Sequence, residues 1–259
     1  MLDSIFKKMC EIRYFELGII KNIDKIHCPV YLSMGQEAIA ATISEYYPDF
    51  RVFPQHRGHA WYLAYGGATE ALRDELLGLG TGCCRGMGGS SDIQCARVEA
   101  HHGLLGENIP LAVGYALASH QGTIAAFGDG AIEEDYAGVA LGFASTHKLP
   151  ILFVCEDNNL AILTEVKERR NWKAIGLAKG YKLDFADIDD NPEEILRALK
   201  NLKLPALINI HTLRHKWHVG IGEDGKPSFD RLKMFKSKIL SSKTIEEDAK
   251  LKMELLWKL

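Results

Sequence analysis

The chain turns at Ala126-Phe127-Gly128-Asp129-Gly130-Ala131 and again at Glu156-Asp157-Asn158-Asn159, and these two stretches decide its predicted fold. Small β-forming residues from Thr123 to Phe127 lead into the first stretch. A helix is predicted from about Ile132 to His147, and an apolar strand from Leu149 to Cys155 leads into the second stretch. This order predicts a right-handed strand–helix–strand unit, with both strand ends at one edge of a parallel sheet.

Asp129 and Asn158 follow the two strands and are therefore expected to face the same crevice. Oxygen ligands of this kind suit Mg²⁺, with Ca²⁺ or Mn²⁺ as alternatives. The helix expected after Gly130 would offer free N–H groups and its positive end to an anion. A Gly-Asp-Gly turn is common by itself, because Asp caps helices and Gly suits tight turns. Two asparagines after the next strand favour a site for a metal ion and a diphosphate.

The combination resembles the thiamine-diphosphate motif, in which Asn-Asn follows Gly-Asp-Gly after one strand–helix–strand unit. Gly128 to Ala131 and Leu149 to Glu156 are similar to one branch, the α subunits of the first component of 2-oxo acid dehydrogenases (pyruvate, branched-chain and acetoin types). The more specific match is Gly103-Leu104-Leu105-Gly106 with Pro110-Leu111-Ala112 behind it. The resemblance covers about residues 29–225.

The resemblance implies a role for individual residues around the cofactor. Arg57 would contact the diphosphate and His59 would line the active site, whereas His56 stands where the family usually has an aromatic hydroxyl. The carbonyl of Gly103 and the N–H of Leu105 would hold the aminopyrimidine ring.

Further implied residues follow the second strand and a later one. The Leu160 carbonyl would be a metal ligand, Ile162 would support the bent cofactor, and His218, with Arg214 as a helper, would bind the diphosphate. The implied catalytic residues are His59 and His218. The implied cofactor-binding residues are His56, Arg57, Gly103, Leu105, Gly128, Asp129, Gly130, Ala131, Asn158, Ile162, Arg214 and His218, and the metal ligands are Asp129, Asn158 and Leu160.

Besides His56, two further positions depart from the family pattern. The chain has Asp92 after Gly88-Gly89-Ser90-Ser91, where the family has histidine, and this change is expected to alter substrate contacts. Val219 stands where mitochondrial members carry a phosphorylatable serine, so regulation by phosphorylation at this position is expected to be absent.

The expected fold class is α/β: a parallel sheet flanked by helices, the thiamine-diphosphate-binding fold of the pyrophosphate type. The 259 residues, 47 % of them apolar, suffice for one domain spanning residues 1–259, with its core at about 29–225. The net charge of −3 suggests neither nucleic acid nor an anionic membrane as a partner. Six cysteines without metal-ligand spacing, and no signal peptide, favour reduced thiols in a cytoplasm.

Elements outside the motifs are also predicted from pattern. Leu2 to Lys21 is expected to be an amphipathic helix, and Arg169 to Gly180 another helix. Asn191 and Pro192 are expected to start a helix from Glu193 to Leu202. The tail from Gly220 is expected to be a solvated face, with a capping box at residues 244–247 that starts a last helix.

The predicted function is the α subunit of a thiamine-diphosphate- and Mg²⁺-dependent enzyme. It would decarboxylate a 2-oxo acid and pass the activated unit to a lipoyl carrier or an aldehyde acceptor. In the resembled family a β subunit supplies the glutamate that protonates the pyrimidine ring, so an α₂β₂ assembly is expected. The alternatives are the amino-terminal half of a split transketolase, a carbon–carbon carboligase, and a non-catalytic module that kept the fold.

Overall fold

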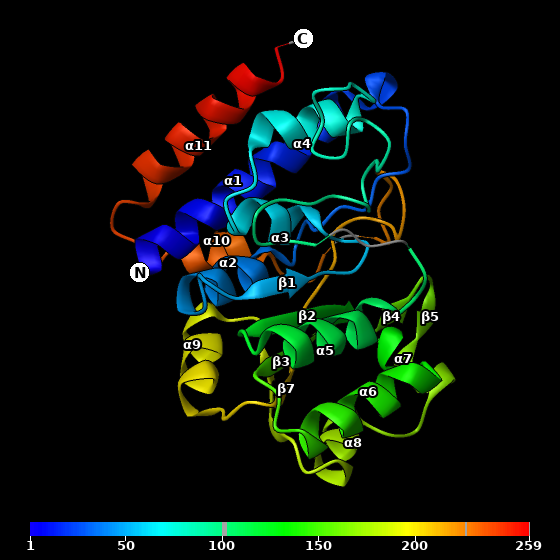
Figure 1. The fold of residues 1–259 in the computed structure, drawn as a ribbon. Helices are drawn as coiled ribbons and strands as arrows, with labels where there is room; N and C mark the ends of the chain where they lie inside the picture. The colour runs from blue at the N-terminus through cyan, green and yellow to red at the C-terminus, as the bar shows by residue number, and fades with distance from the viewer. Residues whose placement is uncertain (100–102, 226, 259) are drawn as a thin grey trace.

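A five-stranded parallel sheet forms the centre of the computed structural model, which describes residues 1–99, 103–225 and 227–258 (Figure 1). The strand order is β1-β2-β3-β7-β6, and each neighbouring pair is parallel. The strands are β1 (Arg51–Phe53), β2 (Thr123–Gly128), β3 (Ile151–Asp157), β6 (Asp184–Asp189) and β7 (Ala206–His211). A small antiparallel hairpin of β4 (Leu160–Ala161) and β5 (Thr164–Glu165) follows β3.

Helices cover both faces of the sheet. On one face lie α5 (Asn108–Ser119), α6 (Asp135–Thr146) and α8 (Ala174–Gly180); on the other lie α2 (Glu37–Tyr46), α3 (His59–Ala64) and α9 (Pro192–Asn201). Outside these layers the chain forms α1 (Leu2–Lys21), η1 (Ile23–Lys25), α4 (Thr69–Leu76), η2 (Ala131–Glu133), α7 (Val166–Arg169), α10 (Arg231–Lys236) and α11 (Ser242–Leu256). The predicted fold class is confirmed.

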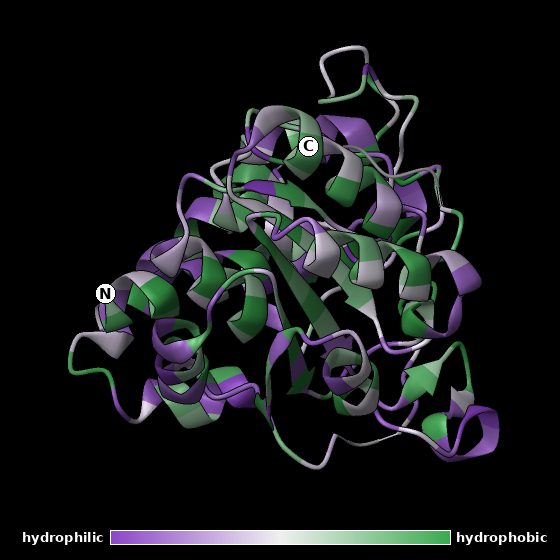
Figure 2. Ribbon diagram, turned by 60° about the horizontal axis from the view of Figure 1, so that its bottom comes forward, coloured by the Kyte–Doolittle hydropathy of each residue, from purple (hydrophilic) through white to green (hydrophobic). Residues whose placement is uncertain are grey.

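The central strands are apolar on both sides because helices cover both sides. Ala125 and Phe127 of β2 pack toward α5 and α6, whereas Ile124 and Ala126 pack toward α2 and α3. Figure 2 shows the hydrophobic residues running along these strands. The β2–β3 register pairs Gly128 with Glu156, which brings the two sequence motifs to the same edge of the sheet, as predicted.

The predicted elements differ from the structure in three places. The sequence pattern predicts Pro110 at the first position of a helix that runs to Ser119, but Pro110 is the third residue of α5, since the helix begins at Asn108. The single helix predicted from Arg169 to Gly180 is two short helices, α7 and α8, separated by extended backbone at Arg170 and Lys173. The strand β6 was not predicted, because an edge strand with alternating aspartates has no apolar run to mark it.

Both ends of the chain pack onto the domain. The apolar side of α1 is fully buried, as predicted, and α11 lies along α1 (Figure 1). Met253, Leu256 and Trp257 belong to the same apolar cluster as Phe15, so the expectation of a solvated tail is wrong for α11. The predicted capping box is also wrong, because α11 begins at Ser242 without a side-chain cap. At α9 the Asn191 side chain accepts from Glu193 N at 3.0 Å, as predicted.

In the part of the chain that the structure describes, every helix is too short or too polar to cross a bilayer.

Candidate active site

A cavity of about 300 Å³ lies at the carboxyl ends of the central strands. It brings together most of the residues that the sequence singled out, from five separate segments of the chain. The predicted residues that line it are His56, Arg57, Gly103, Leu105, Gly128, Asp129, Gly130, Ala131, Asn158, Leu160, Ile162 and His218. The lining residues for which the sequence predicted no role are Tyr31, Gln36, Gln55, Ser91, Glu156 and Ala161.

The three predicted metal ligands lie in this cavity together. Asp129 is 1 % exposed, and its Oδ2 accepts from the Arg169 guanidinium. Burial raises the pKa of Asp129, Asp157 raises it further, and Arg169 opposes both effects. The Asn158 amide donates from Nδ2 to Gln36 Oε1 at 2.9 Å, and its Oδ1 accepts from Leu160 N at 3.1 Å. The Leu160 N–H, which can only donate, therefore fixes which amide atom of Asn158 is the oxygen, and that oxygen keeps a second lone pair for a cation.

The glycines of the turn make room for a ligand and for a neighbouring hairpin. A Cβ built on Gly128 would meet nothing within 4 Å, so open space lies above this cavity-lining residue. A Cβ on Gly130 would lie 2.9 Å from the Cβ of Ala161, which explains why only glycine lets the β4–β5 hairpin approach.

The predicted helix start after Gly130 is less regular than expected. The chain first forms the three-residue 3-10 helix η2, becomes extended at Glu134, and only then starts α6 at Asp135. Asp135 in the first turn of α6 also places a negative charge at the N-terminus of that helix, where it would repel an anion. The turn itself, and not a long helix, is therefore what faces the cavity.

Cationic and aromatic side chains form the opposite wall. Arg57 is buried, donates to the carbonyls of Leu32 and His218, and lines the cavity. Burial and the nearby Arg214 lower the pKa of Arg57 to about 10, so it stays a cation at neutral pH. The ring centroids of His56 and His218 are 4.9 Å apart, and Tyr31 packs edge-on against both rings.

His218 is neutral at physiological pH. Burial lowers its pKa to about 4, and the positive charges of Arg57 and Arg214 contribute in the same direction. A neutral imidazole can donate one hydrogen bond and accept another, which suits contact with a polar ligand in the cavity.

Two predicted site residues lie outside the cavity. His59 is fully buried between Glu16, whose Oε1 is 3.1 Å from Nδ1, and Ser90, whose Oγ is 2.9 Å from Nε2. Arg214 donates to Asp224 at 2.7 Å and to the Ile162 carbonyl at 2.7 Å. In this geometry His59 anchors the loop that carries Ser90, and Arg214 holds the backbone of Ile162.

Glu156 is a lining residue that the sequence motif contained but to which no role was given. Burial raises the pKa of Glu156 to about 7, while Trp61 Nε1, donating at 3.2 Å, and the Arg57 charge oppose the shift. Its position at the carboxyl end of a buried strand was the available signal, because the carboxyl ends of parallel strands meet at the site.

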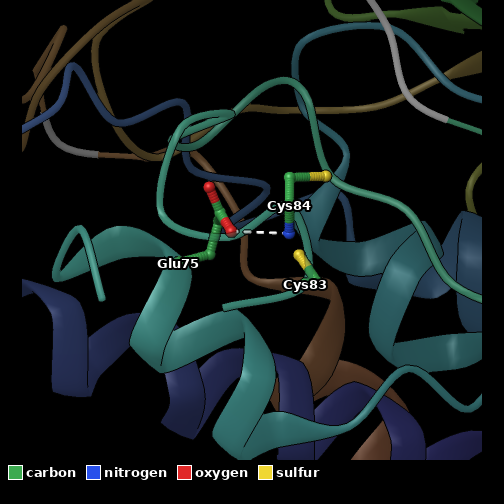
Figure 3. Close-up of side chains that lie close together, drawn as sticks. All are labelled: Glu75, Cys83 and Cys84. Carbon is green, nitrogen blue, oxygen red and sulfur yellow. Dashed lines mark hydrogen bonds between the residues drawn. The ribbon is translucent and has the colours of Figure 1, made fainter. Parts of the chain in front are cut away.

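The Gly-rich loop from Gly78 to Ser91 is held by one carboxylate. Glu75 Oε2 accepts from the backbone N–H of Cys84 at 2.6 Å and of Gly86 at 2.9 Å, as Figure 3 shows for Cys84. Its Oε1 accepts from Gly88 at 2.7 Å and from Gly89 at 3.2 Å. A glycine-rich sequence of this kind is typical of a mobile surface loop, but this loop is fixed around Glu75 and places Ser91 at the cavity.

Glu75, Cys83 and Cys84 also offer three ligand atoms within 4.8 Å of one another (Figure 3). The carboxylate oxygens are already occupied by four backbone donors. Burial raises the pKa of the Cys83 thiol to about 12 and that of Cys84 as well, which keeps both thiols protonated and poor as ligands. The cluster closes the loop and does not have the chemistry of a metal site.

The fold is that of transketolases. A solved transketolase from Campylobacter jejuni matches with a TM-score of 0.67 and 18 % identity, covering 97 % of this chain and 48 % of that one. A transketolase from Pichia stipitis matches with a TM-score of 0.66 and 14 % identity, covering 99 % of this chain and 47 % of that one. The chain therefore spans about half the length of these neighbours, and at such identities the likeness shows the fold alone.

The family is shown by sequence comparison. The family model described as "Dehydrogenase E1 component" matches residues 13–226, and the chain belongs to this family. The pyruvate dehydrogenase E1 component subunit alpha of Rickettsia bellii is 25 % identical over 233 residues, covering 82 % of this chain and 71 % of the relative. The chloroplastic pyruvate dehydrogenase E1 component subunit alpha-3 of Arabidopsis thaliana is 30 % identical over 243 residues, covering 84 % of this chain and 55 % of the relative. The predicted family, the α-subunit type of 2-oxo acid dehydrogenase first component, is confirmed.

Proposed function

We propose that the chain is the α subunit of an enzyme that binds thiamine diphosphate and Mg²⁺, decarboxylates a 2-oxo acid, and transfers the activated unit to an acceptor. The single observation that carries this proposal is the meeting of Asp129, Asn158 and the Leu160 segment in one cavity that Arg57 and His218 also line. The family membership and the relatives that are pyruvate dehydrogenase α subunits support the same activity.

The residues present fit the cofactor. A carboxylate oxygen of Asp129, the Oδ1 of Asn158 and the carbonyl of Leu160 would hold the metal ion, an oxygen set that suits Mg²⁺. Arg57 would contact the diphosphate, since a guanidinium can bind two phosphate oxygens at once. Open space above Gly128 leaves room for the phosphates.

The cofactor ring would lie against Gly103, Leu105 and Ile162. Ile162 lines the cavity with a side chain that is 59 % exposed, and the Arg214–carbonyl hydrogen bond fixes its backbone. When bound, thiamine diphosphate supplies the nucleophilic carbon and the electron sink that decarboxylation of a 2-oxo acid requires.

The protein's own side chains would handle protons near the reacting carbonyl. His218, neutral at pH 7, would donate a hydrogen bond to the substrate, and its carbonyl is tied to Arg57. Glu156 has a pKa of about 7 and can therefore gain or lose a proton near neutral pH. His59, buried behind Ser90, would act on the site by positioning the loop and not by touching the substrate.

A β subunit is the proposed partner. The helices α5 and α6 pack against each other, and both expose apolar residues: Leu111 and Leu117 on α5, and Val139 and Phe143 on α6. A Cβ on Gly114 of α5 would meet nothing within 4 Å, so another chain could approach this helix closely. Exposed apolar residues on two adjacent helices are a common feature of subunit interfaces. A cytoplasmic setting stays a prediction, supported by six cysteines that are all free thiols.

The proposal is tested by co-expressing the chain with candidate β subunits. Mg²⁺-dependent binding of thiamine diphosphate and CO₂ release from a panel of 2-oxo acids would then be measured, with lipoyl and aldehyde acceptors compared by product analysis. Asp129→Ala should abolish cofactor binding. Full binding by this variant would contradict the proposed metal site.

A further inference from the structure

Arg169, the last residue of α7, contacts the carboxylate of Asp129 from outside the cavity. Its Nη2 donates to Asp129 Oδ2. Asp129 lines the cavity, whereas Arg169 is not one of its lining residues. Among residues 1–99, 103–225 and 227–258, no donor binds the second oxygen, Oδ1. We propose that Arg169 is a positioning residue that orients Asp129 so that Oδ1 faces the metal ion, an inference that rests on the proposed function.

The arginine belongs to a four-member ion cluster that ties α7 to the Gly-Asp-Gly turn. Arg169 Nη1 binds Glu133 Oε1, and Arg170 Nη1 donates both to Glu133 Oε1 and to the carbonyl of Asp129. The arginine side chains are only 12 % and 3 % exposed. Asp129 is thus held at its side chain by one arginine and at its backbone by the other.

Packing around the turn restricts this arrangement further. A Cβ built on Gly130 would lie 2.9 Å from Ala161 Cβ and 3.4 Å from Arg169 Nη1. The hairpin and the guanidinium therefore fill the space beside the turn. A planar donor fixed in this way limits rotation of the carboxylate that it binds.

Arginine at this carboxylate could act in two opposite ways. It could compete with the metal ion for Asp129, or it could hold the carboxylate in the orientation that the metal ion needs. Its place outside the cavity and its second anchor at Glu133 favour the holding role. Partners that orient metal ligands typically contribute about 10–100-fold to metal affinity.

The test is a titration of the full chain with Mn²⁺ in the presence of thiamine diphosphate, with free Mn²⁺ followed by electron paramagnetic resonance. Arg169→Gln should weaken Mn²⁺ binding by about 10-fold or more. Arg169→Lys should recover part of the loss, because it keeps the charge. The matched control is Lys167→Gln on the same helix, since Lys167 is exposed and pairs only with Glu165 among the described residues. This control should bind as the wild type does.

Glu133→Gln is a second variant. It removes the other anchor of the Arg169 guanidinium and leaves both Arg169 and Asp129 unchanged. It should weaken Mn²⁺ binding in the same direction by a smaller factor, with the far-ultraviolet circular dichroism unchanged. If Arg169→Gln binds Mn²⁺ as tightly as the wild type or more tightly, while Asp129→Ala does not bind it, the role proposed for Arg169 is wrong. The proposed metal site would then still stand. Wild-type binding by Asp129→Ala would instead overturn the proposed function, and the inference with it.

Discussion

Trp257 packs its indole ring directly against Gly18. A Cβ on Gly18 would lie 2.1 Å from Cδ1 and Nε1 of that ring, a separation that real atoms do not reach. The ring also lies 5.4 Å from the ring of Phe15, centroid to centroid. This contact joins the end of the chain to its first helix and makes α11 part of the folded domain.

Gly18→Ala is therefore expected to destabilise the protein. Overpacking of this kind costs about 1–3 kcal/mol, more than the roughly 1 kcal/mol that alanine gains over glycine in a helix. Urea unfolding would measure the change. The matched control is Gly176→Ala in α8, where a Cβ meets nothing within 4 Å and stability should rise. A Gly18→Ala variant as stable as the control would show that the ring is not held where the structure places it.

Replacing Glu75 with Gln should loosen the Gly-rich loop. The carboxylate accepts four backbone N–H groups, and an amide would turn an NH₂ group toward some of them. The expected loss is about 2 kcal/mol of unfolding free energy, the range for charge-assisted hydrogen bonds to buried groups. Faster tryptic cleavage after Arg85 would report the loop itself. Glu70→Gln, an exposed change on the same helix, should leave both measurements unaltered.

Ile162→Asn is expected to stabilise the folded protein while weakening the binding of thiamine diphosphate. Ile162 has a φ of +55°, a left-handed backbone that strains a β-branched residue, and its side chain is 59 % exposed. Asparagine tolerates this backbone, so thermal unfolding should show a gain of about 1 kcal/mol. Binding of thiamine diphosphate should weaken at the same time. Leu163→Asn, an exposed neighbour without the positive φ, should give no gain in stability.

His218 should contribute a loss of stability as pH falls from 6.5 toward 4, against an opposite contribution from Glu156, whose pKa is raised to about 7. Burial and two arginine charges lower its pKa from 6.5 to about 4, so the unfolded chain binds a proton in this window that the folded chain does not. The His218 contribution to the unfolding free energy therefore rises with pH across the window. His218→Gln should make the slope of unfolding free energy against pH less positive in this window than it is in the wild type, as measured by urea unfolding. An unchanged slope would mean that the imidazole is not desolvated as the structure indicates.

Val139→Glu tests the proposed subunit interface. Val139 lies on α6 with 71 % of its surface exposed, so folding stability should change by less than about 0.5 kcal/mol. Co-purification with a β subunit should be lost, because a charge would be buried at the interface. Leu251→Glu on α11, also exposed, is the matched control and should keep the partner. Retention of the partner by both variants would place the interface elsewhere.

The sequence alone was enough to predict the central unit and most of the residues that line the cavity. Gly128-Asp129-Gly130 and Asn158-Asn159 each follow an apolar strand, and the right-handed crossover rule leaves one geometry for such a unit. The parallel sheet and the meeting of Asp129 with Asn158 follow from that local pattern. The helix cap at Asn191 is a local interaction as well, and it was predictable for the same reason.

The tertiary structure decided every feature that depends on residues far apart in the chain. Gln36 reaches Asn158, Glu16 buries His59, and Trp257 covers Gly18, contacts that no local pattern encodes. The raised pKa of Glu156 and the lowered pKa of His218 depend on burial by several elements at once. The succession of elements along the chain and the side-chain periodicity are local properties of the sequence, whereas burial and charge contacts arise only after the chain has folded.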